Sequence, residues 1–348
     1  MELLDIRTIF LQEDAKNKRS EEIISRFPQA NIIPVKSHWD IPQLQDPDLV
    51  KNWNQVKKHV LVLGKIKSLK NTLSGRSTDF ISPSHSNGCA MACAYCYVAR
   101  RKGYANPITL FTNISNVIEC IDKHSKMQPK KVKNQCDPKY WTYDIGCNND
   151  VSVDATLSDN VKDLINFFAN SLVAKGSFAT KYVNEELLNY NPKQKTRIRF
   201  SLMPEKIRKL VDVRTSSTID KIKAINKFVD AGYEVHINFS PVIVYDGWLA
   251  DYEELFEQIL DFTNAKSYLQ LKYEVIFLTH NKDLHDINLK WHPKAEALLW
   301  TPENQETKIS LNGSENIRYA NRHKANYIYM FKRMIQKHLP FTSIRYIF

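Results

Sequence analysis

The stretch "SNGCAMACAYCYVARR" (residues 86–101) contains Cys89, Cys93 and Cys96, three of the six cysteines in the chain. A zinc knuckle, a disulfide or an iron–sulfur cluster with one open iron could each explain cysteines this close together. Three thiolates without a fourth suit a [4Fe–4S] cluster in which three irons are held by the protein. The spacing therefore favours the cluster, and the rest of the chain has to fit that interpretation.

The composition is that of an ordinary soluble protein. Of the 348 residues, 43% are hydrophobic and 25% are charged, and no apolar run approaches the roughly 18 residues of a membrane span. The N-terminus has acidic residues before its basic ones and no small-residue cleavage site, which does not resemble a signal peptide. We therefore expect a cytoplasmic protein without a membrane partner, in which close-set cysteines hold metal more often than they form disulfides.

The chain is strongly basic. Its 49 basic and 38 acidic residues give a formal charge of +11. Such a surplus suits a polyanionic partner such as DNA or RNA, and lysines in residues 123–135 are candidate contacts to its backbone. A basic soluble protein without such a partner has the same charge, so charge alone leaves both interpretations open.

Strand-like and helix-like segments alternate along the chain. Runs rich in β-branched and aromatic residues occur at 59–64, 108–113, 141–146, around residue 199, 235–244 and 273–278. Apolar stripes with helical spacing occur at 160–175 and 218–232. This alternation predicts βα units and a parallel sheet, as a full or partial barrel whose chemistry lies at the carboxyl ends of the strands.

The two ends of the chain differ from this pattern. Residues 1–55 are predicted to form a small N-terminal helical extension, and residues 56–348 the barrel itself. Asn312 and Gly313 lie between short alternating arms, which predicts a β-hairpin near 306–320. The stretch 327–339 predicts a C-terminal amphipathic helix, followed by a last strand.

The cysteine spacing resembles the signature of the radical S-adenosylmethionine superfamily. That resemblance implies a partial (β/α)6 TIM-like barrel in the α/β class, with a [4Fe–4S] cluster and S-adenosylmethionine as cofactors. S-adenosylmethionine would chelate the open iron, and its reductive cleavage would yield a 5′-deoxyadenosyl radical. The alternative is a zinc site, for which His85 or Cys120 could supply a fourth ligand.

Six further segments resemble the spore photoproduct lyase family in their order and spacing. They are "KKHVLVLGK" (57–65), "YDIGCNND" (143–150), "FATKYVNEELL" (178–188), "KTRIRFSLMPE" (195–205), "VDAGYEVHINFSPVIVYDGW" (229–248) and "IRYANRHKANYIY" (317–329). The resemblance implies a DNA repair enzyme that reverses the spore photoproduct, 5-thyminyl-5,6-dihydrothymine, to two thymines.

The resemblance also implies roles for particular residues. Cys147 would donate a hydrogen atom to the thymine radical, which suits the weak S–H bond of a thiol, although a buried structural cysteine is the alternative. Tyr95 and Tyr97 would line the site and return a radical to the cofactor. Lys181 would pair with the carboxylate of S-adenosylmethionine, and Ser201 would bind its ribose. Cys120 and Cys136 match no family motif and are predicted to be structural.

Several positions depart from the family pattern. Asn149 occupies the place of a family serine near the lesion, and Met203 the place of an asparagine. Ala92 and Ala94 replace residues common in the cysteine loop. Because a stacked lesion has to be extruded from the duplex, the hairpin is a candidate wedge, with Arg318 placed to fill the gap or bind phosphate.

The resemblance thus implies a radical carbon–carbon lyase that acts on UV-damaged DNA. An electron donor such as a flavodoxin or ferredoxin is its expected partner, and a monomer its expected state. Two rivals remain: a divergent radical enzyme with another nucleic-acid or small-molecule substrate, and a zinc-containing nucleic-acid-binding protein without enzymatic activity.

Overall fold

The computed structural model describes residues 3–44, 52–100, 106–309 and 315–348, and these form two compact units. Unit 1 comprises Met1–Ala92, Tyr97–Ile198 and Ala231–Glu234; unit 2 comprises Cys93–Cys96, Arg199–Asp230 and Val235–Phe348. The cysteine loop is therefore divided, because Cys89 belongs to unit 1 and the other two cysteines of the motif belong to unit 2.

The first sheet of unit 1 has five strands. Their order is β2 (Asn31–Val35), β1 (Thr8–Gln12), β3 (Val60–Gly64), β7 (Ile108–Phe111) and β6 (Ser86–Asn87). The first four run parallel, and β6 is antiparallel to β7. Ile9, Leu61 and Leu110 are fully buried in the three central strands, as expected for a parallel sheet covered on both faces.

Helices connect the parallel strands of this sheet. Helix α1 (Lys18–Ser25) follows β1, and α2 (Trp53–His59) precedes β3. Asn17 and Ser20 form a capping box at the start of α1, which satisfies two of its free backbone donors. The prediction of a helical extension over residues 1–55 is therefore incomplete, since β1 and β2 join the sheet. Strand β2 is an exposed edge strand that contains Pro34, so it lacks the alternation by which strands are recognised.

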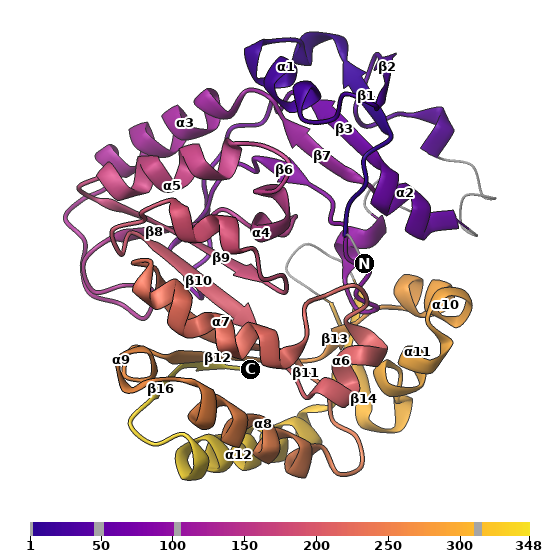
Figure 1. Cartoon of the computed structure of the whole chain (residues 1–348). Coiled ribbons are helices and arrows are strands. Elements are labelled where there is room, and N and C mark those ends of the chain that lie inside the picture. The colour runs from indigo at the N-terminus through magenta and orange to yellow at the C-terminus, as the bar shows by residue number, and fades with distance from the viewer. Residues whose placement is uncertain (1–2, 45–51, 101–105, 310–314) are drawn as a thin grey trace. The chain divides into compact units, whose positions relative to one another are not determined.

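The remaining strands of unit 1 belong to a second sheet. They are β4 (Thr72–Leu73), β5 (Phe80–Ile81), β8 (Trp141–Asp144) and β9 (Ala174–Thr180), with β5, β8 and β9 parallel. Helices α3 (Ile114–Met127) and α5 (Asn160–Asn170) lie side by side (Figure 1), and α5 packs on β9. A Cβ atom on Gly176 would lie 2.6 Å from Cδ2 of Phe168, so only glycine permits this approach of helix and strand.

Unit 2 contains a second group of strands with helices around them. In order these are β10 (Thr196–Ser201, whose first residues belong to unit 1), β11 (Glu234–Val242), β12 (Lys272–Phe277) and β16 (Ser343–Ile347). The helices of this part of the chain are α6 (Glu205–Val211), α7 (Thr218–Asp230), α8 (Trp248–Phe262), α9 (Ala265–Tyr268), α10 (Lys282–Trp291), α11 (Pro293–Leu299) and α12 (Asn321–His338). Helices α8 and α12 lie side by side (Figure 1), where the rings of Trp248 and Phe331 stack at 5.9 Å.

A separate three-stranded sheet in unit 2 contains the predicted hairpin. Its order is β13 (Thr279–His280), β15 (Glu315–Tyr319) and β14 (Gln305–Ile309). Strands β14 and β15 are antiparallel, with Glu306 opposite Arg318. The two arms of the hairpin are thus confirmed, whereas the Asn312–Gly313 turn lies outside the described residues.

Most sequence-predicted elements are present, with some differences at their ends. The α/β class is confirmed, as are the C-terminal helix and the last strand. The helix predicted over 160–175 ends at Asn170, because residues 174–180 form β9. Among the described residues, short 3-10 helices include Glu13–Ala15, Pro42–Leu44, Tyr97–Arg100, Glu185–Asn189 and Pro302–Asn304. Helix α4 (Val151–Asp154) is a single-turn α-helix. Across the ranges given above, no helix has the length and apolar character needed to span a membrane.

Candidate active site

Cys147 lies in the loop between β8 and α4, and its side chain is exposed. The hydroxyl of Tyr97 donates to the backbone oxygen of Cys147 at 3.3 Å and to Oδ1 of Asn148 at 3.2 Å. Nδ2 of Asn148 in turn donates to Oγ of Ser84 at 3.2 Å. The structure of unit 1 thus brings together Tyr97 and Cys147, two residues that the sequence places far apart.

A second contact holds the Cys147 loop against the start of the cysteine segment. The backbone N–H of Gly88 donates to the backbone oxygen of Asn148 at 3.0 Å. Gly88 has a φ of +92°, and a Cβ atom there would lie 2.4 Å from the backbone oxygen of Pro107. Position 88 therefore needs glycine both for its left-handed backbone and for space.

A buried carboxylate lies behind this loop. Asp154 is fully buried, and its Oδ2 accepts hydrogen bonds from Ser86 and Asn149 and lies 3.1 Å from Nε2 of His85. Nδ1 of His85 and Oδ1 of Asn149 are buried and have no hydrogen-bond partner among the described residues. The amide donor of Asn149 is thus directed at Asp154, and Nε2 of His85 faces the same carboxylate.

Asp150 joins the ends of two neighbouring strands. Its Oδ2 accepts from the backbone N–H of Lys181 at 3.0 Å, and its Oδ1 from the hydroxyl of Thr180 at 2.8 Å and from the first turn of α4. Burial raises the pKa of Asp150 to about 6, although the hydrogen bonds from Lys181 and Thr180 oppose this. Lys181 is thereby held at the same edge of the parallel pair β8–β9 as the Cys147 loop.

The cysteine segment is held by backbone contacts in each unit. In unit 1, Nζ of the buried Lys57 donates to the backbone oxygen of Cys89 at 2.7 Å. In unit 2, the backbone N–H of Ala94 donates to Val211, and Nδ2 of Asn288 donates to the oxygen of Ala94 at 2.7 Å. All six cysteines of the chain are among the described residues, and none forms a disulfide.

Tyr95 has a different environment from Tyr97. Its hydroxyl donates to Oδ1 of Asp212, a fully buried carboxylate of unit 2. Burial, and then the charge of Asp212, raise the pKa of Tyr95 well above its ordinary value. The phenol therefore stays protonated at physiological pH and anchors the loop between Cys93 and Cys96. Tyr97, by contrast, is 53% exposed.

The other sequence-predicted residues of unit 2 are in ordinary structural surroundings. Ser201 is buried at the end of β10, and its backbone oxygen accepts from Nζ of Lys221 at 2.8 Å. Met203 is buried. The guanidinium of Arg318 donates to Glu306 at 3.1 Å and to Asn321 at 3.2 Å. A phosphate would have to compete with Glu306 for Arg318.

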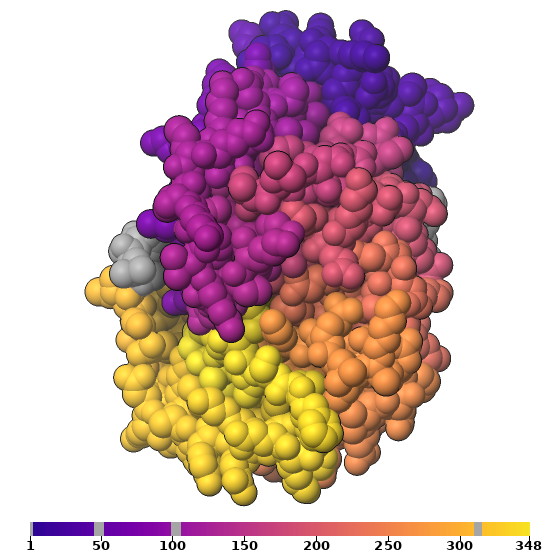
Figure 2. All heavy atoms as spheres, turned by 90° about the vertical axis from the view of Figure 1, so that its left-hand side faces the viewer, coloured from indigo at the N-terminus to yellow at the C-terminus, as the bar shows by residue number. Residues whose placement is uncertain are grey.

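The basic segment 123–135 is largely neutralised within unit 1. Residues 123–127 belong to α3, which lies on the surface of unit 1 (Figure 2), and not to a loop. Lys123 and Lys126 form ion pairs with carboxylates one turn earlier in the helix, and the buried Lys131 pairs with Asp79 at 2.5 Å. These three lysines are therefore poor candidates for contacts to a DNA backbone.

The chain was compared with models of known protein families. A family model described as "Spore photoproduct lyase" matches residues 7–348. The chain belongs to the spore photoproduct lyase family. The match includes the cysteine segment and the Cys147 loop, and it favours the iron–sulfur interpretation of the cysteines over the zinc one.

Individual members of the family are distant relatives of the chain. It is 29% identical to the spore photoproduct lyase of Bacillus subtilis (strain 168) over 58% of this chain and 57% of that protein. It is 25% identical to the spore photoproduct lyase of Geobacillus sp. (strain Y412MC61), over 69% of this chain and 68% of the relative. The aligned part thus spans little more than half of the length of the first of these relatives.

Solved structures of spore photoproduct lyase have the same fold as this chain. A substituted variant with bound AdoMet and dinucleoside spore photoproduct has a TM-score of 0.89 at 20% identity, with 100% of both chains covered. A complex with dinucleoside spore photoproduct also has a TM-score of 0.89, at 21% identity over 100% of both chains. The predicted TIM-like partial barrel of the radical S-adenosylmethionine type is therefore confirmed.

Sequence reasoning missed the residues that hold this site in place: Lys57, Asp150, Asp154 and Asp212. A signal existed for Asp150, because an aspartate directly before an apolar run is a common helix N-cap. The other three carry no local signal. Their partners lie in segments that are remote in sequence, so only the folded chain identifies them.

Proposed function

We propose that this member of the spore photoproduct lyase family reverses the spore photoproduct in UV-damaged DNA to two thymines. The observation that carries the proposal is the hydrogen bonding of Tyr97, adjacent to Cys96, to the loop of Cys147. Both residues of this contact belong to unit 1, and the thiol of Cys147 is exposed. The same proposal places Cys147 within reach of a substrate radical, where a buried structural cysteine could not act.

The residues present fit a [4Fe–4S] cluster with an open iron. Cys89, Cys93 and Cys96 offer three thiols, none in a disulfide, and the backbone of their loop is anchored on both sides. In the part of the chain that is described, no three His, Cys, Asp or Glu side chains are already gathered as a metal site, so the fit rests on the spacing of the cysteines, their free thiols and the backbone contacts of their loop. Cluster and S-adenosylmethionine together would supply the one-electron cleavage that generates a hydrogen-abstracting adenosyl radical.

Cys147 is the proposed hydrogen-atom donor. After removal of the C6 hydrogen of the lesion, the methylene bridge between the two thymines breaks and leaves a thymine radical. The thiol of Cys147 would transfer its hydrogen atom to that radical, because an S–H bond is weak and an exposed thiol can be reached. Tyr97, hydrogen-bonded to the backbone of Cys147, would pass a hydrogen atom to the thiyl radical left on Cys147 and so relay the radical back towards the cofactor.

The other predicted site residues would bind the cofactor, position the site or contact DNA. Lys181 would bind the carboxylate of S-adenosylmethionine, and Ser201 its ribose. Tyr95 would position the cluster loop through Asp212 and would not exchange hydrogen itself. Asn149 would position the Cys147 loop through Asp154, because its donor group is directed there and not outward. Arg318 would contact DNA only after giving up Glu306.

The proposed setting follows from this chemistry. A cytoplasmic location would keep the cysteines reduced, and a flavodoxin or ferredoxin would supply the electron. Damaged DNA would be the substrate, with the lesion extruded from the duplex. We expect the chain to act as a monomer.

The test is an anaerobic assay of reconstituted protein with dithionite, S-adenosylmethionine and dinucleoside spore photoproduct. Formation of thymine, without stoichiometric consumption of S-adenosylmethionine, is the expected result. Cys147→Ala should abolish clean repair while Cys120→Ala, a matched change of another cysteine, should leave it intact. Cleavage of S-adenosylmethionine without thymine would refute the substrate and favour a divergent radical enzyme.

A further inference from the structure

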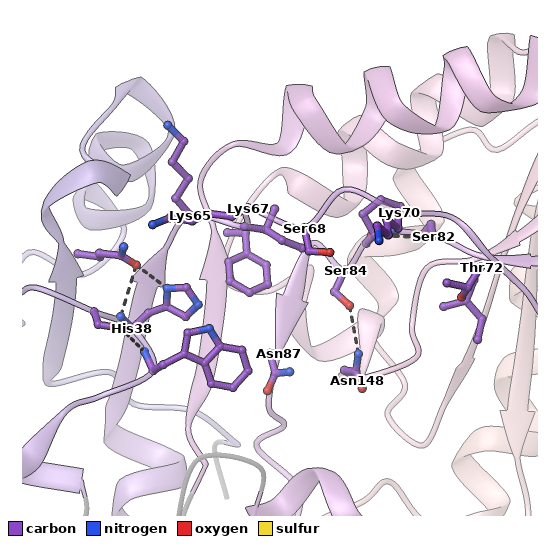
Figure 3. Close-up of a pocket in the computed structure, with 17 residues that line it drawn as sticks. His38, Lys65, Lys67, Ser68, Lys70, Thr72, Ser82, Ser84, Asn87 and Asn148 are labelled. Carbon is purple, nitrogen blue, oxygen red and sulfur yellow. Dashed lines mark hydrogen bonds between the residues drawn. The ribbon is translucent and has the colours of Figure 1, made fainter. Parts of the chain in front are cut away.

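A cavity of about 590 Å³ lies in unit 1 beside the Cys147 loop. The segment after β3, the segment after β5 and the segment after β2 line it, and so does Asn148. Figure 3 shows Lys65, Lys67 and Lys70 spread along the upper part of the view, with Ser84 near Lys70 and hydrogen-bonded to Asn148 below it.

The cavity is strongly basic. Lys65, Lys67 and Lys70 are exposed, and no ion pair joins any of them to a described residue. The 17 residues that line the cavity include no aspartate or glutamate. This is unlike segment 123–135, where carboxylates already neutralise the lysines. Three uncompensated positive charges around one hollow favour an anionic ligand.

The cavity also offers hydroxyl donors and an aromatic surface. Ser37, Ser68 and Ser84 contribute hydroxyl groups. Trp39 is 53% exposed, and its ring centroid lies 5.5 Å from that of the buried His38. A supported and exposed aromatic ring among lysines is the combination with which proteins bind unpaired nucleotides, since bases stack on the ring and phosphates contact the cations.

The cavity connects directly to the proposed hydrogen-donor loop. Asn148 lines it and donates to Ser84, and its Oδ1 accepts from Tyr97, whose hydroxyl also contacts the backbone of Cys147. Asn148, a residue of the cavity wall, is therefore the direct chain neighbour of Cys147. A DNA strand with a lesion at Cys147 would have its neighbouring nucleotide at this wall.

We propose that this cavity binds the nucleotide that flanks the lesion in DNA, with Trp39 stacked on its base and Lys65, Lys67 and Lys70 on the backbone phosphates. The proposal rests on the proposed function, because the lesion defines which nucleotide is the flanking one. It separates two tasks: the Cys147 loop recognises the lesion, and the cavity supplies affinity for the strand around it.

The first test compares two substrates of different size. The triple variant Lys65→Gln, Lys67→Gln, Lys70→Gln removes the three charges. We expect its turnover of dinucleoside spore photoproduct, which has no flanking nucleotides, to stay within about twofold of that of the unchanged protein. This turnover also reports that the variant is folded and loaded with its cofactors.

The second measurement is the salt dependence of binding to a single-stranded oligonucleotide that contains the lesion. Each phosphate contact contributes about 0.7 to the slope of log K against log salt for single strands, so three lost contacts should reduce the slope by about 2. The matched control is the triple variant Lys282→Gln, Lys290→Gln, Lys294→Gln, which removes three exposed lysines of α10 and α11. Its slope should change by less than 1.

Substitution of Trp39 tests the stacking independently of charge. Trp39→Ala should weaken oligonucleotide binding about tenfold without a change in the salt slope, whereas Trp39→Phe should retain most of the affinity. Neither change should alter the turnover of the dinucleoside.

Several outcomes would overturn the proposal. They are an unchanged affinity and slope in the first triple variant, an equal loss in the control variant, a parallel loss of dinucleoside turnover, or competition by a free mononucleotide at micromolar concentration. A failure of the proposed function looks different, because the unchanged protein would then release no thymine from the dinucleoside. The binding comparison between the two triple variants would still decide whether the cavity holds a nucleic-acid strand.

Discussion

At the scale of single residues, the two tyrosines around Cys96 have different surroundings despite their similar place in the sequence. Tyr97 is exposed and bonds to the Cys147 loop, whereas Tyr95 bonds to the buried Asp212. The resemblance to the family implied the same role for both tyrosines. Under the proposed function, we therefore expect Tyr97 to take part in the chemistry and Tyr95 to stabilise the cysteine loop.

Tyr97→Phe tests this division. The change removes two hydrogen bonds of an exposed hydroxyl, so we expect a loss of stability below about 1 kcal/mol. Repair should slow, and more 5′-deoxyadenosine should form per thymine, because the relay back to the cofactor is interrupted. The measurement is the ratio of the two products in the anaerobic assay.

Tyr95→Phe is the matched comparison. It deprives the buried carboxylate of Asp212 of a donor, which should lower the free energy of unfolding by about 1–3 kcal/mol. The product ratio should stay as in the unchanged protein once the variant is fully loaded with iron. If Tyr95→Phe changed the ratio and Tyr97→Phe did not, the assigned roles would be reversed.

At the scale of secondary-structure elements, one buried carboxylate connects three strands of unit 2. Glu274 on β12 is bonded by Arg199 of β10 at 3.2 Å, and by Arg345 and Tyr346 of β16. Glu274 is fully buried. Although burial would raise its pKa, Arg199 and Arg345 outweigh it and hold the pKa at about 2, below the usual 4.5.

The pH dependence of stability follows from this shift. Since the carboxyl group has a lower pKa in the folded state, its contribution is complete above about pH 4.5 and is lost as the pH falls towards 2. A shift from 4.5 to about 2 corresponds to about 3 kcal/mol at 1.36 kcal/mol per unit. Glu274→Gln should therefore destabilise the neutral protein by about 3 kcal/mol and flatten its stability profile between pH 5 and 2.

Denaturant unfolding at a series of pH values measures both effects. Glu253→Gln is a suitable control, because Glu253 is a more exposed carboxylate of α8 that pairs with Lys337 and His338. It should change the free energy of unfolding by less than about 1 kcal/mol. An equal acid sensitivity of the Glu274→Gln variant and the unchanged protein would count against the role given to Glu274.

At the scale of the whole molecule, the three cysteines of the motif come from two units of the chain. Under the proposed function, cluster assembly should depend on each of these three cysteines and on none of the other three. Cys120 and Cys136 donate to backbone oxygens of unit 1 at 3.4 Å, as structural thiols do.

Iron loading provides the corresponding test. Cys89→Ala, Cys93→Ala and Cys96→Ala should each lose most of the iron and the brown colour of the reconstituted protein. Cys120→Ala, Cys136→Ala and Cys147→Ala should retain about four irons per chain. Retention of one zinc and no iron by the unchanged protein would support the zinc alternative instead.

Much of the architecture could be predicted because it leaves a local pattern. Helices α5 and α7 follow their apolar stripes, and the hairpin arms follow their alternation. Strand β9 was missed because the apolar residues after α5 were assigned to the same helix. The helical spacing of apolar residues in fact ends near Ser171, before β9 begins. Strand β2 was missed because an exposed edge strand has no buried face to produce a pattern.

The order of residues along the chain is enough to establish the cysteine spacing, the resemblance to the family, the βα alternation and the position of Cys147 after a strand. Each of these features is a pattern of neighbouring or ordered residues, so it can be recognised without coordinates. Which charged side chains are paired and which are exposed becomes known only from the folded chain. The side chain of Lys131 is buried and paired with Asp79, whereas Lys65 is exposed, and the amide donor of Asn149 is directed at Asp154. The physical reason is that a hydrogen bond or ion pair depends on the distance between side chains, and chain folding sets that distance for residues far apart in the sequence.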